Sequence, residues 1–210
     1  MKKISNYQIQ DWLFSIANGH FDIDLAESGI HPHHINDIQF SKNYDLNYSL
    51  DVGQEELRRI IANMYQVNYK RVLITNGSQE ALYLFYRSML SPQDHVITFV
   101  PGWQQSWEVP AHIGCEVTKI HLNREHGYQI NIKNIVGNLK PNTKLIILTS
   151  PNNPLGIVVD EHDLQLLSDL CHNTRSTLFI LSLHVITPRS RDNVCSWLAA
   201  ILGGTRTYWM

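Results

Sequence analysis

The sequence predicts an α/β fold with a largely parallel sheet and flanking helices. Short apolar runs rich in β-branched residues alternate with segments whose apolar residues recur at helical spacing, with about 20–30 residues between successive runs. Turn-forming residues, mainly Gly, Pro and Asn, follow several of these runs. This alternation is typical of βαβ units around a parallel sheet. The runs assigned to strands are 72–75, 95–100, 115–122, 144–149 and 177–181.

The N-terminal part predicts two helices and one strand. Residues 1–19 carry apolar side chains at helical spacing and predict a short amphipathic helix. Residues 21–25 alternate between apolar and acidic side chains, which indicates a half-buried strand. Residues 54–65, directly after Gly53, predict a second amphipathic helix.

Three histidines, His31, His33 and His34, lie in the loop that follows the first predicted strand. Metal ligands have to converge on one point, and this proline-interrupted loop brings no acidic partner. We therefore expect an ordinary polar loop and no metal site.

Residues 71–90 predict a strand, a tight turn and a helix. The apolar run 72–75 ends at Asn76–Gly77, a pair that tolerates a positive φ. Ser78 is a good N-cap for the helix that follows. Backbone N–H groups and the helix dipole at such a turn suit a phosphate, although an ordinary strand-to-helix turn has the same pattern.

The remaining elements follow from the same signals. Ser91–Pro92 ends the preceding helix, and Gly114 ends the next one. The further helices are expected at 103–113, 130–139 and 160–171. Because parallel strands end at one edge of a sheet, loops 76–79, 101–107 and 150–156 are expected to meet in one pocket.

Composition limits the protein class. With 43% hydrophobic residues, the chain can bury a real core. The net charge of −2 and the lack of a basic patch argue against nucleic-acid binding, and against a DNA-binding regulator. Cys115, Cys171 and Cys195 are far apart, which favours a reducing compartment. There is no signal-peptide pattern, and no apolar run reaches the roughly 18 residues of a membrane span, so we expect a cytoplasmic protein.

Four motifs together resemble the class I/II aminotransferases, which are pyridoxal-phosphate (PLP) enzymes of fold type I. They are YSLDVGxxxLR at 48–58, TNGSQEAL at 75–82, PGW at 101–103 and SPNNPLG at 150–156. The resemblance implies a partial PLP-binding large domain at 46–182, preceded by an N-terminal arm and part of the small domain at 1–45. It also implies transfer of an amino group from an amino acid to a 2-oxo acid.

The resemblance assigns roles to single residues. Ser78 and Gln79 match the phosphate cup, where a hydroxyl and backbone N–H groups hold a dianion. Trp103 matches the aromatic residue that stacks on the pyridine ring. Asn153 matches the asparagine that donates to the phenolic oxygen of PLP.

Two further matches concern the dimer and the substrate. Tyr48 matches a tyrosine that reaches the phosphate in the neighbouring subunit, which implies a homodimer with shared sites. Gly29 lies near the loop that holds the substrate carboxylate in the family.

The sequence departs from the family after residue 182. The family pairs an acid with the pyridine nitrogen and uses a lysine for the Schiff base and proton transfer. Here no acid stands between Leu181 and Asp192, and the last lysine is Lys144. The 183–210 tail does not resemble the family, although Leu198–Leu202 could form a short helix. We interpret the tail as a frameshift or broken gene, or alternatively as the end of a genuine short paralogue.

Two functional hypotheses follow. The first is an aminotransferase by descent that is inactive as this chain, because the covalent nucleophile is missing. The second is a non-enzymatic fragment that binds PLP weakly, dimerises with an intact homologue, or is the unstable product of a pseudogene.

Overall fold

The computed structural model describes residues 5–23, 34–37, 47–48 and 50–182, together with the backbone of short strands in the C-terminal part. The chain divides into two compact units, one covering Asn6–Asp51 and the other covering Val52–Met210 with Met1–Ser5. Each unit is described by itself.

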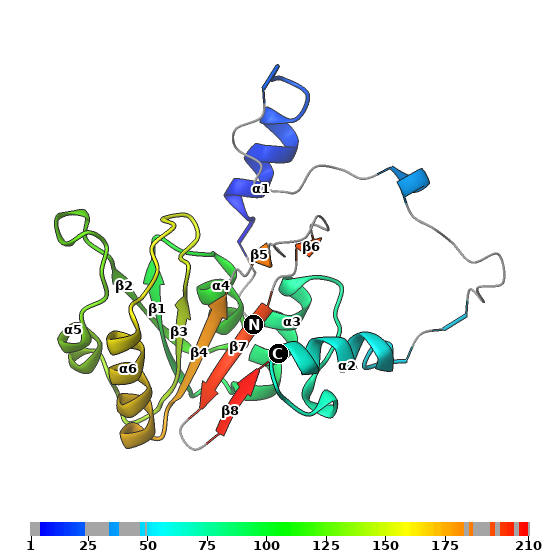
Figure 1. The fold of residues 1–210 in the computed structure, drawn as a ribbon. Coiled ribbons are helices and arrows are strands. Elements are labelled where there is room, and N and C mark those ends of the chain that lie inside the picture. The colour runs from blue at the N-terminus through cyan, green and yellow to red at the C-terminus, as the bar shows by residue number, and fades with distance from the viewer. Residues whose placement is uncertain are drawn as a thin grey trace. The chain divides into compact units, whose positions relative to one another are not determined.

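The larger unit contains a sheet with the strand order β2-β1-β3-β4-β7-β8 (Figure 1). The first four strands in this order are parallel to their neighbours, as the sequence predicts, whereas β4–β7 and β7–β8 are antiparallel. A separate pair is formed by β5 (Val185–Ile186) and β6 (Val194–Cys195). The strands of the main sheet are β1 (His95–Val100), β2 (Glu116–His121), β3 (Thr143–Thr149), β4 (Thr177–Ser182), β7 (Leu198–Gly203) and β8 (Arg206–Trp209).

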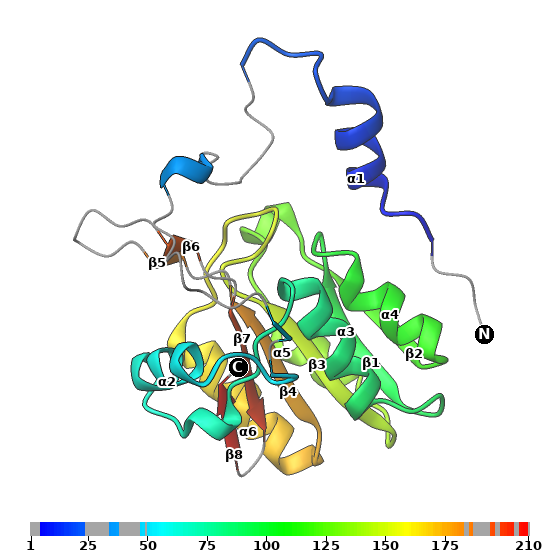
Figure 2. The same ribbon diagram turned by 90° about the vertical axis from the view of Figure 1, so that its right-hand side faces the viewer.

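Helices cover both faces of the parallel strands (Figures 1 and 2). On one face, α3 (Ser78–Met89) and α4 (Gln105–Ile113) pack on side chains such as Val96 and Phe179. On the other face, α5 (Ile132–Gly137) and α6 (Glu161–Thr174) pack on side chains such as Ile97 and Leu178. Because neighbouring residues of a strand point to opposite faces, the inner strands β1 and β3 are mostly apolar along their length, whereas the edge strand β2 is largely polar.

Each of the two layers contains one buried cysteine. Cys115 belongs to the α3/α4 layer, and burial raises its pKa to about 11. Cys171 belongs to the α5/α6 layer, and burial raises its pKa to about 12.

The segment 72–75 is not a strand, contrary to the prediction. Its backbone groups bond elsewhere: the carbonyl of Val72 accepts a hydrogen bond from Nε of Arg58 at 2.7 Å, and the N–H of Ile74 donates to the carbonyl of Val52 at 3.2 Å. Arg58 belongs to α2 (Glu55–Met64), which confirms the helix expected there. On this helix Arg58 and Ala62 are buried, whereas Leu57, Ile60 and Met64 are 42–53% exposed.

The smaller unit contains α1 (Gln8–Trp12), which continues as a π-helix, η1 (Leu13–Ala17), and a short 3₁₀ helix, η2 (Ile35–Asp37). The amphipathic helix expected in 1–19 is therefore present. The strand expected at 21–25 is wrong over residues 21–23, which form a bend, and residues 24–25 lie outside the described residues. Two further 3₁₀ helices belong to the larger unit, η3 (Tyr69–Arg71) and η4 (Arg124–His126).

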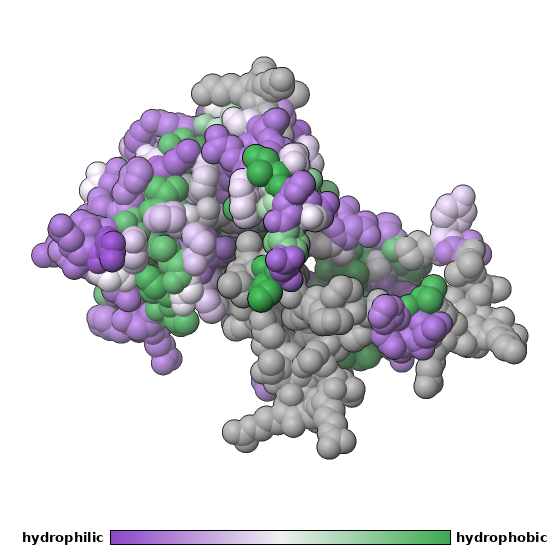
Figure 3. Space-filling view, turned by 90° about the horizontal axis from the view of Figure 1, so that it is seen from above, coloured by the Kyte–Doolittle hydropathy of each residue, from purple (hydrophilic) through white to green (hydrophobic). Residues whose placement is uncertain are grey.

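Hydrophilic side chains make up most of the coloured surface seen from above, and hydrophobic side chains lie in separate groups between them (Figure 3). Within the described residues, no helix has both the length and the apolar character needed to cross a membrane.

A buried histidine, His95 on β1, hydrogen-bonds to both neighbouring strands at the amino end of the sheet. Its Nδ1 lies 2.8 Å from Oγ1 of Thr143, and its Nε2 lies 2.8 Å from Oγ1 of Thr118. Burial lowers the pKa of His95 below its ordinary value of 6.5, Lys140 lowers it further, and Glu116 opposes this shift. The folded protein therefore favours the neutral imidazole.

We expect His95 to make the protein less stable in acid. As the pH falls, the unfolded chain takes up a proton on this histidine near pH 6.5, whereas the folded protein does so only at its lower pKa. The free energy of unfolding therefore decreases as the pH falls from 6.5 to the pKa of the folded protein. The slope is at most about 1.4 kcal/mol per pH unit. Urea unfolding at pH 7.5 and 5.5 tests this. His95→Gln should flatten the pH dependence, whereas His126→Gln, on an exposed residue, should retain it.

Candidate functional site

Three loops meet at the carboxyl edge of the parallel strands. Pro101–Gly102 follows β1, Ser150–Gly156 follows β3, and the turn at 75–77 begins α3. Two hydrogen bonds connect these loops: Nδ2 of Asn152 donates to the carbonyl of Pro101 at 3.3 Å, and Nε2 of Gln105 donates to the carbonyl of Gln79 at 2.8 Å. The loops are therefore connected in pairs, although loop 76–79 does not follow a strand as expected, and a shared pocket stays a prediction.

Gly77, and not Ser78, is the N-cap of α3, so this part of the prediction is wrong. Gly77 has a φ of +85°, which glycine adopts at no steric cost, and Ser78 is already the first helical residue. The first N–H bonded within the helix is that of Ala81, which donates to the carbonyl of Gly77 at 3.4 Å. The N–H groups of Ser78 and Gln79 therefore precede the helical hydrogen-bond ladder.

Glu80 contacts the turn at 76–79 and was not among the residues predicted for it. Its Oε2 accepts a hydrogen bond from the N–H of Asn76 at 2.5 Å. Glu80 stands three residues after the N-cap, a position from which glutamate commonly reaches back to the chain before a helix, and this spacing was a usable signal. The carboxylate accepts this hydrogen bond, and its negative charge stabilises the start of α3 through the helix dipole.

The two asparagines of the 150–156 loop differ in their surroundings. Asn152 is buried and holds the loop together: its Oδ1 accepts from the N–H of Leu155 at 3.1 Å, and its carbonyl accepts from the N–H of Gly156 at 2.7 Å. Asn153 is half-buried, and among the described residues none hydrogen-bonds to its side chain. The amide of Asn153 is therefore available to a ligand, while Asn152 builds the loop.

Trp103 and Trp107 also differ. Trp103 is half-buried and packs against the α3/α4 layer, and its carbonyl accepts a hydrogen bond from the N–H of Ser106 at 3.0 Å. The ring of Trp107 faces the Lys119 ammonium, with 4.8 Å between Nζ and the ring centroid. A Cβ on Gly102 would lie 2.5 Å from the carbonyl oxygen of Phe99, so the close turn before Trp103 requires glycine.

Gln105 and Ser106 are buried polar residues at the start of α4, and no sequence pattern singles them out. Oε1 of Gln105 and Oγ of Ser106 have no hydrogen-bond partner in the part of the chain that the structure describes. A glutamine and a serine in an amphipathic helix resemble ordinary surface residues, so only the fold shows their burial.

The structure does not test the roles of several other predicted residues. Tyr48 belongs to the smaller unit, where its side chain is fully exposed. Gly29, His31 and His33 lie outside the described residues, as do residues 183–184 and Asp192, where an acid after β4 was sought. The roles of Tyr48 and Gly29 stay predictions.

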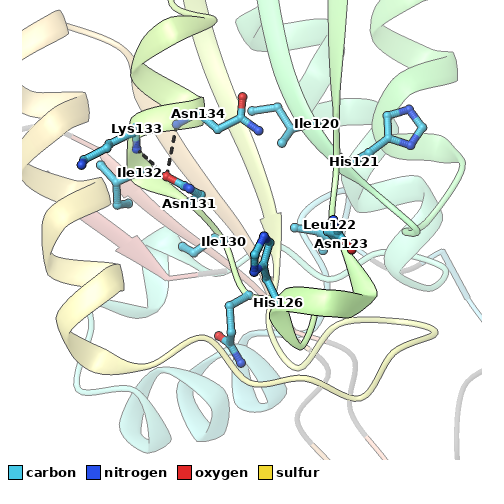
Figure 4. A pocket seen from close by; sticks show the side chains of 11 residues that line it. Ile120, His121, Leu122, Asn123, His126, Ile130, Asn131, Ile132, Lys133 and Asn134 are labelled. Atoms are coloured by element: carbon cyan, nitrogen blue, oxygen red, sulfur yellow. Dashed lines mark hydrogen bonds between the residues drawn. The ribbon is translucent and has the colours of Figure 1, made fainter.

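A separate groove of about 710 Å³ lies at the carboxyl end of β2. Its polar side chains do not converge, because His121 and Lys133 point to opposite sides (Figure 4). Asn131 is occupied as the N-cap of α5, where it accepts from the N–H groups of Lys133 and Asn134. We do not assign a function to this groove.

Residues 28–187 match the family model for aminotransferase class I and II. The chain belongs to this family. It is 32% identical over 121 residues to a histidinol-phosphate aminotransferase from Dehalococcoides mccartyi, a match that covers 57% of this chain and 33% of the relative. It is 27% identical over 163 residues to an aspartate aminotransferase from Musicola paradisiaca, covering 72% of this chain and 41% of the relative.

Solved aminotransferase structures share the fold. Thermus thermophilus aspartate aminotransferase with maleate matches with a TM-score of 0.64 and 26% identity, over 66% of this chain and 38% of that one. A PLP-dependent aminotransferase from Streptococcus suis matches with a TM-score of 0.63 and 30% identity, over 73% of this chain and 41% of that one. The chain thus spans 33–42% of the length of the aminotransferases it matches. Members of this family depend on PLP.

Proposed function

We propose that this chain carries the PLP-binding core of an aminotransferase, an enzyme that moves an amino group from an amino acid to a 2-oxo acid. We further propose that these 210 residues bind PLP reversibly and have negligible transaminase activity. The observation that carries the proposal is the linkage of the three motif loops at one sheet edge, through the Asn152–Pro101 and Gln105–Gln79 hydrogen bonds.

The donors at this edge fit PLP. Ser78 supplies a hydroxyl, and the N–H groups of Ser78 and Gln79 stand at the positive end of the α3 dipole, which suits a phosphate dianion. The Asn153 amide would donate to the phenolic oxygen, and the face of Trp103 would cover the pyridine ring and exclude water. When bound, PLP supplies the electron sink for negative charge at the amino-acid α-carbon.

The proton-handling groups are absent from these residues. No lysine follows Lys144, so nothing after the 150–156 loop can bind the cofactor covalently and then move the α-proton. No acid stands between Leu181 and Asp192 to keep the pyridine nitrogen protonated. For these 210 residues alone we therefore expect reversible binding without turnover.

A homodimer with shared sites and a cytoplasmic location complete the proposal. The match of Tyr48 to a residue that reaches the neighbouring subunit supports the dimer. The exposed apolar side chains of Leu57, Ile60 and Met64 on α2 also favour a partner surface, and they equally support the alternative of a non-enzymatic, dimerising fragment. The free, buried thiols of Cys115 and Cys171 agree with a reducing compartment.

We expect PLP to bind saturably and to be released on dialysis. An absorbance titration measures this, and borohydride treatment with mass spectrometry afterwards should find no single labelled lysine. Ser78→Ala should weaken binding about tenfold, because it removes a hydrogen bond to a charged group. Ser88→Ala, further along the same helix with its hydroxyl on the Phe85 carbonyl, is the matched control. A titration without saturation, or one specifically reduced lysine, would contradict the proposal.

A further inference from the structure

Arg58 is a buried arginine on α2, with 8% of its surface exposed, whereas its neighbour Arg59 is exposed and pairs with Glu55 at 2.7 Å. A buried charge costs free energy unless its donors are hydrogen-bonded. A buried arginine is therefore compatible with a stable fold only where its N–H donors meet well-placed acceptors.

The donors of Arg58 meet the backbone of one short segment. Nε donates to the carbonyl of Val72 at 2.7 Å, and Nη2 donates to the carbonyl of Tyr69 at 3.0 Å. The guanidinium also lies over the ring of Tyr69, 5.4 Å from its centroid, and that of Arg59 lies 3.8 Å from the same centroid, so the two carbonyl bonds are what distinguish Arg58. The planar guanidinium thus holds two carbonyls at a fixed spacing, a geometry that a lysine ammonium cannot reproduce.

This segment leads directly into the turn at the start of α3. Gly77 lies five positions after Val72, and in the described sheet no strand pairs with residues 72–75. Besides Arg58, the N–H of Ile74 is held by the carbonyl of Val52, and Ile74 packs closely against Gly53. These contacts take the place of a strand ladder in fixing where the turn begins.

We propose that Arg58 is a positioning residue for the anion-binding turn at residues 76–79. It contacts no part of the ligand; by holding the Tyr69 and Val72 carbonyls it sets the position of the N–H groups of Ser78 and Gln79. The identity of the anion as the phosphate of PLP rests on the proposed function above.

The test compares Arg58→Lys and Arg58→Met with the matched controls Arg124→Lys and Arg124→Met in the full chain, because Arg124 is an exposed arginine beyond β2. The first readout is amide hydrogen exchange without ligand. The amides of 76–80 should exchange at least about tenfold faster in both Arg58 variants. Those of β1 and β3 should stay within about twofold of wild type, because local opening of the turn does not require global unfolding. The Arg124 variants should match wild type in both regions.

The second readout is affinity, measured with PLP and with inorganic phosphate as separate probes. Arg58→Lys should weaken PLP binding at least about tenfold, and Arg124→Lys less than about twofold. Unchanged exchange at 76–80 in Arg58→Lys would overturn the proposal, as would faster exchange of equal size throughout the sheet. If Arg58→Met does not fold, Arg58→Lys carries the test. If wild type binds neither probe, the proposed function fails, while the exchange result still decides the role of Arg58.

Discussion

Replacing Phe179 with alanine is expected to lower the free energy of unfolding by about 3–5 kcal/mol. Phe179 is fully buried in β4, where its ring stacks on Phe85 with 4.4 Å between centroids and an interplanar angle of 15°. The edge of Tyr86 also packs against it, with 6.1 Å between centroids. The substitution would leave a cavity between the sheet and α3 and would remove these aromatic contacts.

Urea unfolding followed by tryptophan fluorescence measures this effect. Phe14→Ala is a control of the same chemistry, because Phe14 is 66% exposed and should change the stability by less than about 0.5 kcal/mol. Equal effects of the two substitutions would show that β4 and α3 do not form the packed layer described above.

Gly53→Ala is expected to have the second-largest effect. A Cβ at this position would lie 2.5 Å from both Cβ and Cγ1 of Ile74, and the φ of +88° is itself strained for alanine. The strain costs about 1–2 kcal/mol and the overpacking a further 1–3 kcal/mol or so. Since Ile74 lies three residues before Gly77, the substitution should also weaken PLP binding.

Gly127→Ala separates these two costs. Gly127 also has a positive φ, +60°, but nothing lies within 4 Å of a Cβ built there. It should therefore show the conformational cost alone, of about 1–2 kcal/mol. Thermal and urea unfolding of both variants measures the difference, and a Gly53 variant no less stable than the Gly127 variant would contradict the close packing of residue 53 on Ile74.

The inner parallel strands were predictable because they are buried on both faces and therefore read as nearly continuous apolar runs. The strand predicted at 95–100 matches β1 residue for residue, and Asp160 begins α6 as its N-cap. The run Val72–Leu73–Ile74 has the same local pattern, yet its backbone partners, Arg58 and Val52, come from distant residues. A local sequence pattern cannot show that the backbone groups of a segment will hydrogen-bond to residues far away in sequence.

The tail also shows that a local sequence pattern does not determine which element forms. The short helix considered for Leu198–Leu202 is wrong, because β7 occupies Leu198–Gly203 and pairs with β4 in antiparallel register. The run Leu-Ala-Ala-Ile-Leu suits a helix locally, and pairing with an existing strand overrides that preference.

The candidate site was predictable as a set of loops, because glycine, proline and asparagine motifs have strong local signatures. The bonds that connect those loops were not, since they depend on Asn152 and Gln105, whose partners lie 51 and 26 residues away. The roles assigned to Ser78, Gln79, Trp103, Asn153, Tyr48 and Gly29 stay predictions until ligand binding is measured.

Because each of the two described helical layers contains a buried cysteine, the rate of thiol labelling can report how often each layer opens. Alkylating reagents react with the thiolate, and burial keeps both thiols protonated and covered in the native state. Labelling of Cys115 therefore counts openings of the α3/α4 layer, and labelling of Cys171 counts those of the α5/α6 layer. With Cys195 replaced by serine, the ratio of the two rates would tell whether the layers separate from the sheet together or independently.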